Sequence, residues 1–68
     1  MGLHYDITIR PRSAGLYYAS IKQMPGFEME AESPDDLEIE VQEAIRYHHL
    51  ASGDRVDGLD FSVTRIER

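Results

Sequence analysis

The chain has no cysteine and no tryptophan among its 68 residues, and no apolar run of bilayer-spanning length. Without cysteine, neither a disulfide framework nor a thiolate-bound zinc ion can support the fold. A membrane-spanning helix needs about 20 apolar residues, and the start Met1–Asp6 lacks the basic-then-apolar order of a signal peptide. We therefore expect a soluble, cytoplasmic protein with one domain, residues 1–68. Because so small a core is thin, we also expect a homodimer.

Positive charge is scarce as well. The chain has seven lysines and arginines and thirteen aspartates and glutamates, so its net charge is −6 and its pI is about 4.8. The segment between Lys22 and Arg46 has eight acids and no base. Phosphate backbones are bound by lysine and arginine, so we expect no direct nucleic-acid binding. An acidic surface is typical of a well-solvated protein or of one that binds a basic partner.

Recognisable catalytic motifs are also missing. The chain has no glycine-rich phosphate loop and no spacing that singles out a nucleophilic serine. His48 and His49 are adjacent, and adjacent helix residues point about 100° apart, so they do not form a chelating pair. A divalent-metal nuclease would need several carboxylates converging on its ions, and Asp6 lacks evident partners. We predict no catalytic residue, no metal site and no cofactor, and a nuclease centred on Asp6 is the least favoured alternative.

Four segments are predicted strands. They are His4–Arg10, Leu16–Met24, Phe27–Glu32 and Leu59–Val63. Three of them alternate apolar and polar residues, the pattern of half-buried strands, and the second is rich in aromatic and other β-forming residues but alternates less regularly. Turn residues follow the first segment at Pro11–Gly15. Pro25-Gly26 after the second suits a type I or II turn, so we expect a wide hairpin or a bulge there. In the second segment we take Tyr17, Ala19 and Ile21 as the core face.

A helix is predicted from Ser33 onward. Ser33 is suited to the N-cap, Pro34 to the first helical position, and two aspartates follow at the positive end of the helix dipole. Gly53 is a suitable residue just after the C-terminal end. A single helical stripe is formed by Leu37, Val41, Ala44, Ile45 and His48. We expect His48 to be a histidine at the edge of the core that makes one hydrogen bond.

Residues 37–41 also alternate as a strand would, but the cap and the continuing stripe favour the helix and leave Ile39 off the apolar face. A polar loop is expected at Gly53–Gly58. The fold class is therefore α+β in the order β-β-β-α-β, with an antiparallel sheet and one helix packed on one face.

These elements resemble the HicB-like antitoxin N-terminal domain and, equally well, small stand-alone relatives of that domain whose role is not assigned. Met24-Pro25-Gly26 stands where that family has Leu-Pro-Gly, Ser33–Leu37 stands at its capped helix start, and Val41–Ile45 is similar to the later part of its helix. The resemblance covers Tyr5 to Leu50. It implies a partial RNase-H-like fold and a partner that is a small basic toxin ribonuclease, inhibited by being covered. The family's C-terminal DNA-binding module has no counterpart here, so operator binding is not expected.

Candidate partner-binding residues follow from charge and exposure. One face of the predicted strand carries Glu28, Glu30 and Glu32. Their negative charges repel one another unless a positively charged surface binds against them. If that strand is a sheet edge, their charges would instead discourage edge-to-edge aggregation. Exposed apolar residues nearby would suit a protein interface, and we select Tyr18, Ile39 and Tyr47. We predict a non-catalytic, antitoxin-type inhibitor of a basic protein. The alternative is a viral inhibitor of a host nuclease complex that mimics nucleic-acid charge.

Overall fold

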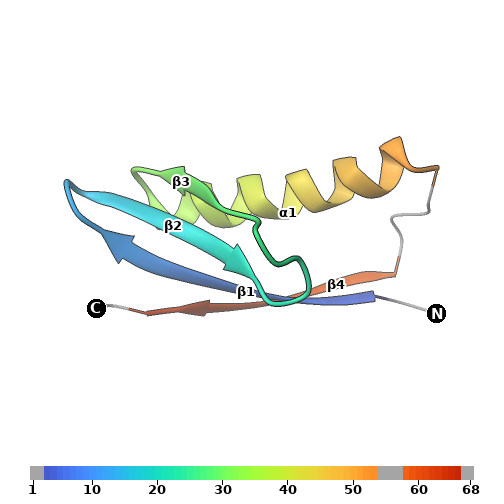
Figure 1. The fold of residues 1–68 in the computed structure, drawn as a ribbon, viewed down its shortest axis with the longest axis horizontal. Coiled ribbons are helices and arrows are strands. Elements are labelled where there is room, and N and C mark those ends of the chain that lie inside the picture. Colours follow the sequence, from blue (N-terminus) through green and yellow to red (C-terminus); the bar gives the residue numbers. More distant parts are fainter. Residues whose placement is uncertain (1–2, 54–57, 67–68) are drawn as a thin grey trace.

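The computed structural model describes residues 3–53 and 58–66, and it consists of four strands and one helix in the order β-β-β-α-β (Figure 1). The elements are β1 (Leu3–Arg12), β2 (Leu16–Ile21), β3 (Met29–Ala31), α1 (Pro34–Ala51) and β4 (Leu59–Arg65). This confirms the α+β class, the element order and the packing of the helix on the sheet. Most of the loop expected at Gly53–Gly58 lies outside the described residues.

The sheet has the strand order β3-β2-β1-β4 and is mixed. β1 pairs antiparallel with β2, and β2 pairs antiparallel with β3. β4 pairs parallel with β1, from Leu3 opposite Leu59 to Ile9 opposite Arg65. The expected antiparallel sheet is therefore wrong for its last strand. Since β3 runs in the same direction as β1 and α1 returns the chain, β4 must again run with β1, as in other helical crossovers.

The first strand is longer than predicted, because β1 continues through Pro11 to Arg12. The parallel pairing with β4 has already ended at Ile9, whose carbonyl accepts the Ile66 N–H at 2.8 Å. Pro11 therefore lies where β1 has no neighbour on that side, and its missing N–H removes no ladder hydrogen bond.

The predicted turn at Pro25-Gly26 is confirmed. The Phe27 N–H donates to the Met24 carbonyl at 3.1 Å, and Gly26 has φ of +90°. A positive φ at the third of four residues is the type II conformation, which glycine adopts without strain. The turn belongs to a wide connection, since β2 ends at Ile21 and β3 begins only at Met29.

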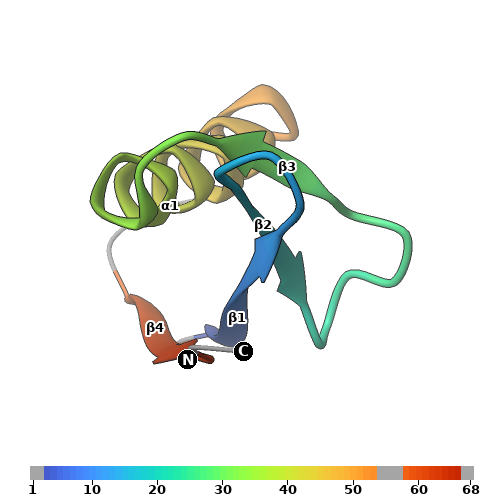
Figure 2. The same cartoon turned by 90° about the vertical axis from the view of Figure 1, so that its left-hand side faces the viewer.

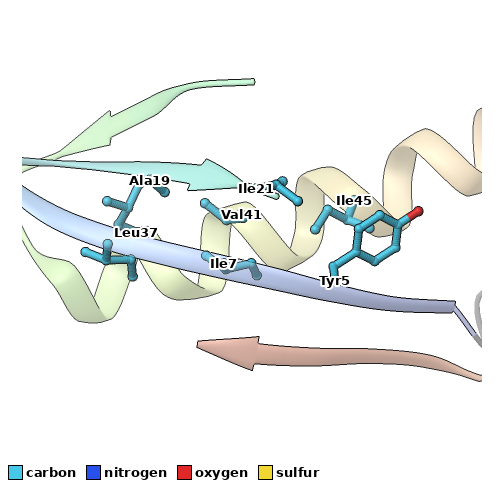
Figure 3. Close-up of a cluster of buried hydrophobic side chains, with 8 residues drawn as sticks. Tyr5, Ile7, Ala19, Ile21, Leu37, Val41 and Ile45 are labelled. Carbon is cyan, nitrogen blue, oxygen red and sulfur yellow. The ribbon is translucent and has the colours of Figure 1, made fainter. Parts of the chain in front are cut away.

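The core lies between the helix and one face of the sheet (Figure 3). Its buried residues come from β1, β2 and α1: Tyr5, Ile7, Ile9, Ala19, Ile21, Leu37, Val41 and Ile45. The predicted core face of β2 is confirmed, because Ala19 and Ile21 are buried and Tyr17 packs against them. The apolar face of β4 is less covered, since Leu59, Phe61 and Val63 are only partly buried.

The helix begins as predicted. Ser33 is the N-cap, and its hydroxyl accepts the Asp36 N–H at 3.4 Å. At the other end Ser52 is the C-cap, and Gly53 follows with φ of +81°. Gly53 is thus in the left-handed conformation expected just after a helix. Among the residues described, α1 included, no helix combines the length and apolar composition that crossing a bilayer requires.

The prediction for His48 is wrong, because His48 is exposed and His49 is buried. The buried helix residues are spaced strictly by four: Leu37, Val41, Ile45 and His49. Each step of four residues rotates the buried position by about 40°, so the stripe drifts around the helix. At the C-terminal end it faces the start of β1, where the Tyr5 hydroxyl lies 2.7 Å from His49 Nε2.

Candidate protein-binding surfaces

Arg12 forms ion pairs with two of the three glutamates of residues 28–32, which we call the β3 segment. Its guanidinium donates to Glu30 Oε2 at 2.6 Å and to Glu28 Oε1 at 3.2 Å. It also lies over the ring of Tyr18, 4.3 Å from the centroid, within cation–π range. The hydrogen bonds to Glu30 and then Glu28 raise the pKa of Arg12. We call this group, on the sheet face opposite α1, the Arg12 cluster.

The glutamates of this segment therefore have a structural role. β3 is a three-residue strand at the edge of the sheet, beside β2. Edge strands expose unpaired backbone groups, and short length and charge discourage them from pairing with other chains. Glu32, just beyond β3, is exposed and makes no ion pair with another described residue. The prediction that this segment binds a partner stays a prediction, and the structure adds edge protection as a second role.

α1 lies over one face of the sheet (Figure 2), so the side of the helix opposite its buried residues faces away from the sheet. This side forms a second acidic surface. Its six exposed residues are Asp36, Ile39, Glu40, Glu43, Tyr47 and Leu50. We call this surface the outer helix face. Within the described part of the chain, none of its three acids forms a salt bridge. Its apolar side chains are 58% (Ile39), 73% (Tyr47) and 60% (Leu50) exposed.

The acids at the edge of α1 nearest β4 are different, because both of them form ion pairs with Arg65. Arg65 Nη2 donates to Asp35 Oδ1 at 2.6 Å and to Glu38 Oε2 at 2.8 Å. The hydrogen bond to Asp35, followed by that to Glu38, raises the pKa of Arg65. This ion-pair group ties the start of the helix to the end of β4. Among the described residues, the acids of the outer helix face therefore differ from Asp35 and Glu38 in having no ion pair.

The six predicted partner-binding residues do not form one surface. Glu28, Glu30 and Tyr18 meet in the Arg12 cluster on the uncovered sheet face. Ile39 and Tyr47 lie on the outer helix face, in the other layer of the molecule.

Sequence reasoning missed Asp36, Glu40 and Glu43 as candidates, because Asp36 was explained by the helix start and neither glutamate was singled out. The available signal was spacing: with Tyr47 they fall at i, i+4, i+7 and i+11, one helical stripe.

A third polar group centres on His4, which bridges β1 and β4 on the uncovered sheet face. Its Nδ1 lies 2.9 Å from Asp60 Oδ2, and its Nε2 lies 3.2 Å from Asp6 Oδ1 and 3.0 Å from Ser62 Oγ. The hydrogen bond to Asp60, and after it that to Asp6, raises the pKa of His4 above 6.5. The Gln23 amide, which donates to Asp6 at 2.7 Å, lowers the pKa of Asp6 below 3.8.

Ser62, His4 and Asp60 have the hydrogen-bond connectivity of a serine-hydrolase triad. Two observations argue against that chemistry. The Asp6 carboxylate lies against the same ring nitrogen as Ser62, and together with Asp60 it favours the imidazolium, which cannot accept a serine proton. The cluster also lies on an open strand surface, with side chains 44% (His4) and 76% (Asp60) exposed. The group is suited to holding β4 against β1.

Asp6, the acid considered for a nuclease, belongs to this hydrogen-bonded group. Within residues 3–53 and 58–66 no three or more histidine, cysteine, aspartate or glutamate side chains are placed to hold a metal ion. Comparison with known proteins finds no matching family model, no matching curated protein and no matching solved structure.

Proposed function

We propose that this chain is a non-catalytic protein that binds and inhibits a basic protein partner, chiefly through the outer helix face. One observation carries the proposal. Of the four large apolar side chains that are exposed among the described residues, three (Ile39, Tyr47 and Leu50) lie on this face, interleaved with three carboxylates that have no ion-pair partner there. Interfaces combine exposed apolar side chains with polar groups in this way.

Both kinds of group favour association with a positive surface. The unpaired acids attract a basic partner over distance and speed the encounter, an effect that salt screens. The apolar side chains then supply contact area, and burying each contributes up to about 2 kcal/mol. Because the face is a regular helix, its side chains are already positioned before binding, which reduces the ordering cost.

The class of partner that we propose follows from the resemblance of the sequence to HicB-like domains. The element order agrees with the order that a HicB-like domain implies, and such domains act on a small basic toxin ribonuclease. We propose a partner of this kind, which is neutralised when its basic active surface is covered. The viral inhibitor remains the alternative, with a host nuclease complex as its target.

The test compares two charge-neutralised variants that each remove three negative charges. One is Asp36→Asn/Glu40→Gln/Glu43→Gln on the outer helix face, and the other is Glu28→Gln/Glu30→Gln/Glu32→Gln in the β3 segment. Proteins retained from source-cell lysate by the wild-type chain are identified. The retained protein is then purified, and its dissociation constant is measured by calorimetry at low and high salt.

We expect the helix variant to weaken binding at least tenfold and to reduce its salt dependence, while the β3 variant binds nearly as well as the wild type. Equal affinity of the wild type and the helix variant would refute the assigned surface. A partner with no net positive charge would refute the proposed chemistry. Ribonuclease activity of the partner, lost on adding the wild-type chain, identifies the toxin class, and a host nuclease subunit identifies the viral alternative.

A further inference from the structure

The two edges of the sheet differ in how well they are protected. The β3 edge is three residues long and contains one glutamate, Glu30, with Glu28 and Glu32 just outside it. The β4 edge is seven residues long, from Leu59 to Arg65, and has no proline, no lysine and one acid, Asp60. Long unprotected edges pair readily with other strands. The β4 edge is therefore the side of this sheet at which another strand would add.

The backbone of β4 is prepared for such pairing. The Gly58 carbonyl and the Ile66 N–H both bond to β1. Backbone groups alternate sides along a strand, so the N–H and C=O groups of the odd-numbered residues, such as Phe61 and Val63, point to the free edge. No hydrogen bond among the described residues uses them. The side chains of these two residues lie on the helix side of the sheet and are only partly buried.

We propose that the β4 edge is a homodimer interface, in which β4 of one copy pairs antiparallel with β4 of a second copy to form a continuous eight-stranded sheet. A two-fold axis perpendicular to the sheet produces this pairing and keeps both helices on the same side. The partly buried apolar side chains of β4 from the two copies then lie side by side, and each covers the other.

The charges beside β4 favour a second copy over a foreign strand. At one end of the strand, Arg65 pairs with Asp35 and Glu38, which leaves a local charge of −1 on the helix side. Nearer the other end, Arg46 lies over the ring of Phe61, 5.3 Å from the centroid, and supplies +1. Because the two-fold axis reverses the strand, it brings Arg46 of each copy toward the acidic end of the other. The edge is thus complementary to itself in charge.

The dimer also leaves both outer helix faces exposed, so that it could engage two basic sites at once. The interface itself does not depend on the proposed function. An experiment that refutes the dimer interface would therefore not refute the proposed function, and the reverse also holds.

The experiment measures the solution mass of the full chain by sedimentation equilibrium, with a chain mass of 7.8 kDa. The test variant is Ser62→Glu/Thr64→Glu, which with Asp60 gives β4 the alternating acids of the β3 segment. Every antiparallel register then places acids of one copy against acids of the other. The control variant, Ser13→Glu/Ser20→Glu, adds the same charge in a turn and on an inner strand.

We expect the wild type and the control to have the mass of two chains and the test variant that of one, with unchanged circular dichroism. A wild type with the mass of one chain at every concentration would overturn the proposal. The β4 edge would then remain free to pair with a strand of a different protein. A test variant that dimerises as well as the control would also overturn it. Should the test variant fail to fold, amide exchange of the wild type decides: slow, concentration-dependent exchange at Phe61 and Val63 is expected, and fast exchange at all concentrations contradicts the interface.

Discussion

Leu37 and Ile39 are two residues apart on α1, and replacing each with alanine tests which face of this segment is buried. Leu37 has no exposed surface, whereas Ile39 is 58% exposed. The segment also alternates as a strand would, and a strand would place both side chains on the same face. If the segment is a helix, the first substitution should lower the stability much more than the second. If it were a strand, the two losses of stability should be similar.

Removing the Leu37 side chain leaves a cavity between α1 and the sheet. Buried leucine-to-alanine substitutions cost about 2–5 kcal/mol, and a domain of this size has a total stability of about 3–10 kcal/mol. We expect Leu37→Ala to cost about 3 kcal/mol, which corresponds to a fall of about 12–24 °C in Tm. Ile39→Ala should change stability by no more than about 0.5 kcal/mol, because an exposed side chain loses little packing.

Urea unfolding followed by circular dichroism at 222 nm measures both values, with the slope of each transition checked against the wild type. Similar losses for the two variants would refute the assignment of the buried face. A loss for Leu37→Ala below about 1 kcal/mol would refute the packing of α1 on the sheet.

Three further predictions concern single side chains. Ser33→Ala should cost about 0.5–1 kcal/mol in the same urea assay and Ser33→Gly less, because the hydrogen bond to Asp36 N is long at 3.4 Å; equal stability of all three proteins would contradict the cap. NMR titration should place the pKa of His4 above 6.5. The stabilisation from His4 is then complete below pH 6.5 and lost as pH rises through that higher pKa, and a His4→Gln variant that keeps the same pH dependence would contradict this. Arg12→Gln should lower the urea midpoint more at low salt than at high salt, because it leaves Glu28 and Glu30 without a counter-charge; a salt-independent loss would contradict repulsion as the cause.

Local signals in the sequence predicted most of the local structure. The Ser33 cap, the Pro25-Gly26 turn and the core face of β2 all depend on residues close together in the chain. The direction of β4 did not follow from such signals, because strand pairing is decided by how α1 crosses the sheet.

The side-chain contacts on the surfaces were also less predictable, because they join residues that are far apart in the chain. Arg12 reaches Glu28 and Glu30 across 16 and 18 positions in the chain, so the row of glutamates looked unpaired in the sequence. His49 replaces His48 in the core because its ring meets Tyr5, 44 positions away. Contacts over such separations depend on the completed fold, and periodicity within one helix does not specify them.

The most direct test of the proposed binding surface is NMR mapping of the interface on the isotope-labelled chain. The purified basic partner is titrated in, and amide shifts and intensity losses are recorded for each residue. We predict that the strongest changes lie along α1, at residues of the outer helix face such as Glu40, Glu43 and Tyr47. If the strongest amide shifts and intensity losses occur at the Arg12 cluster and α1 is unaffected, the account is contradicted. The interface would then be assigned to the β3 segment.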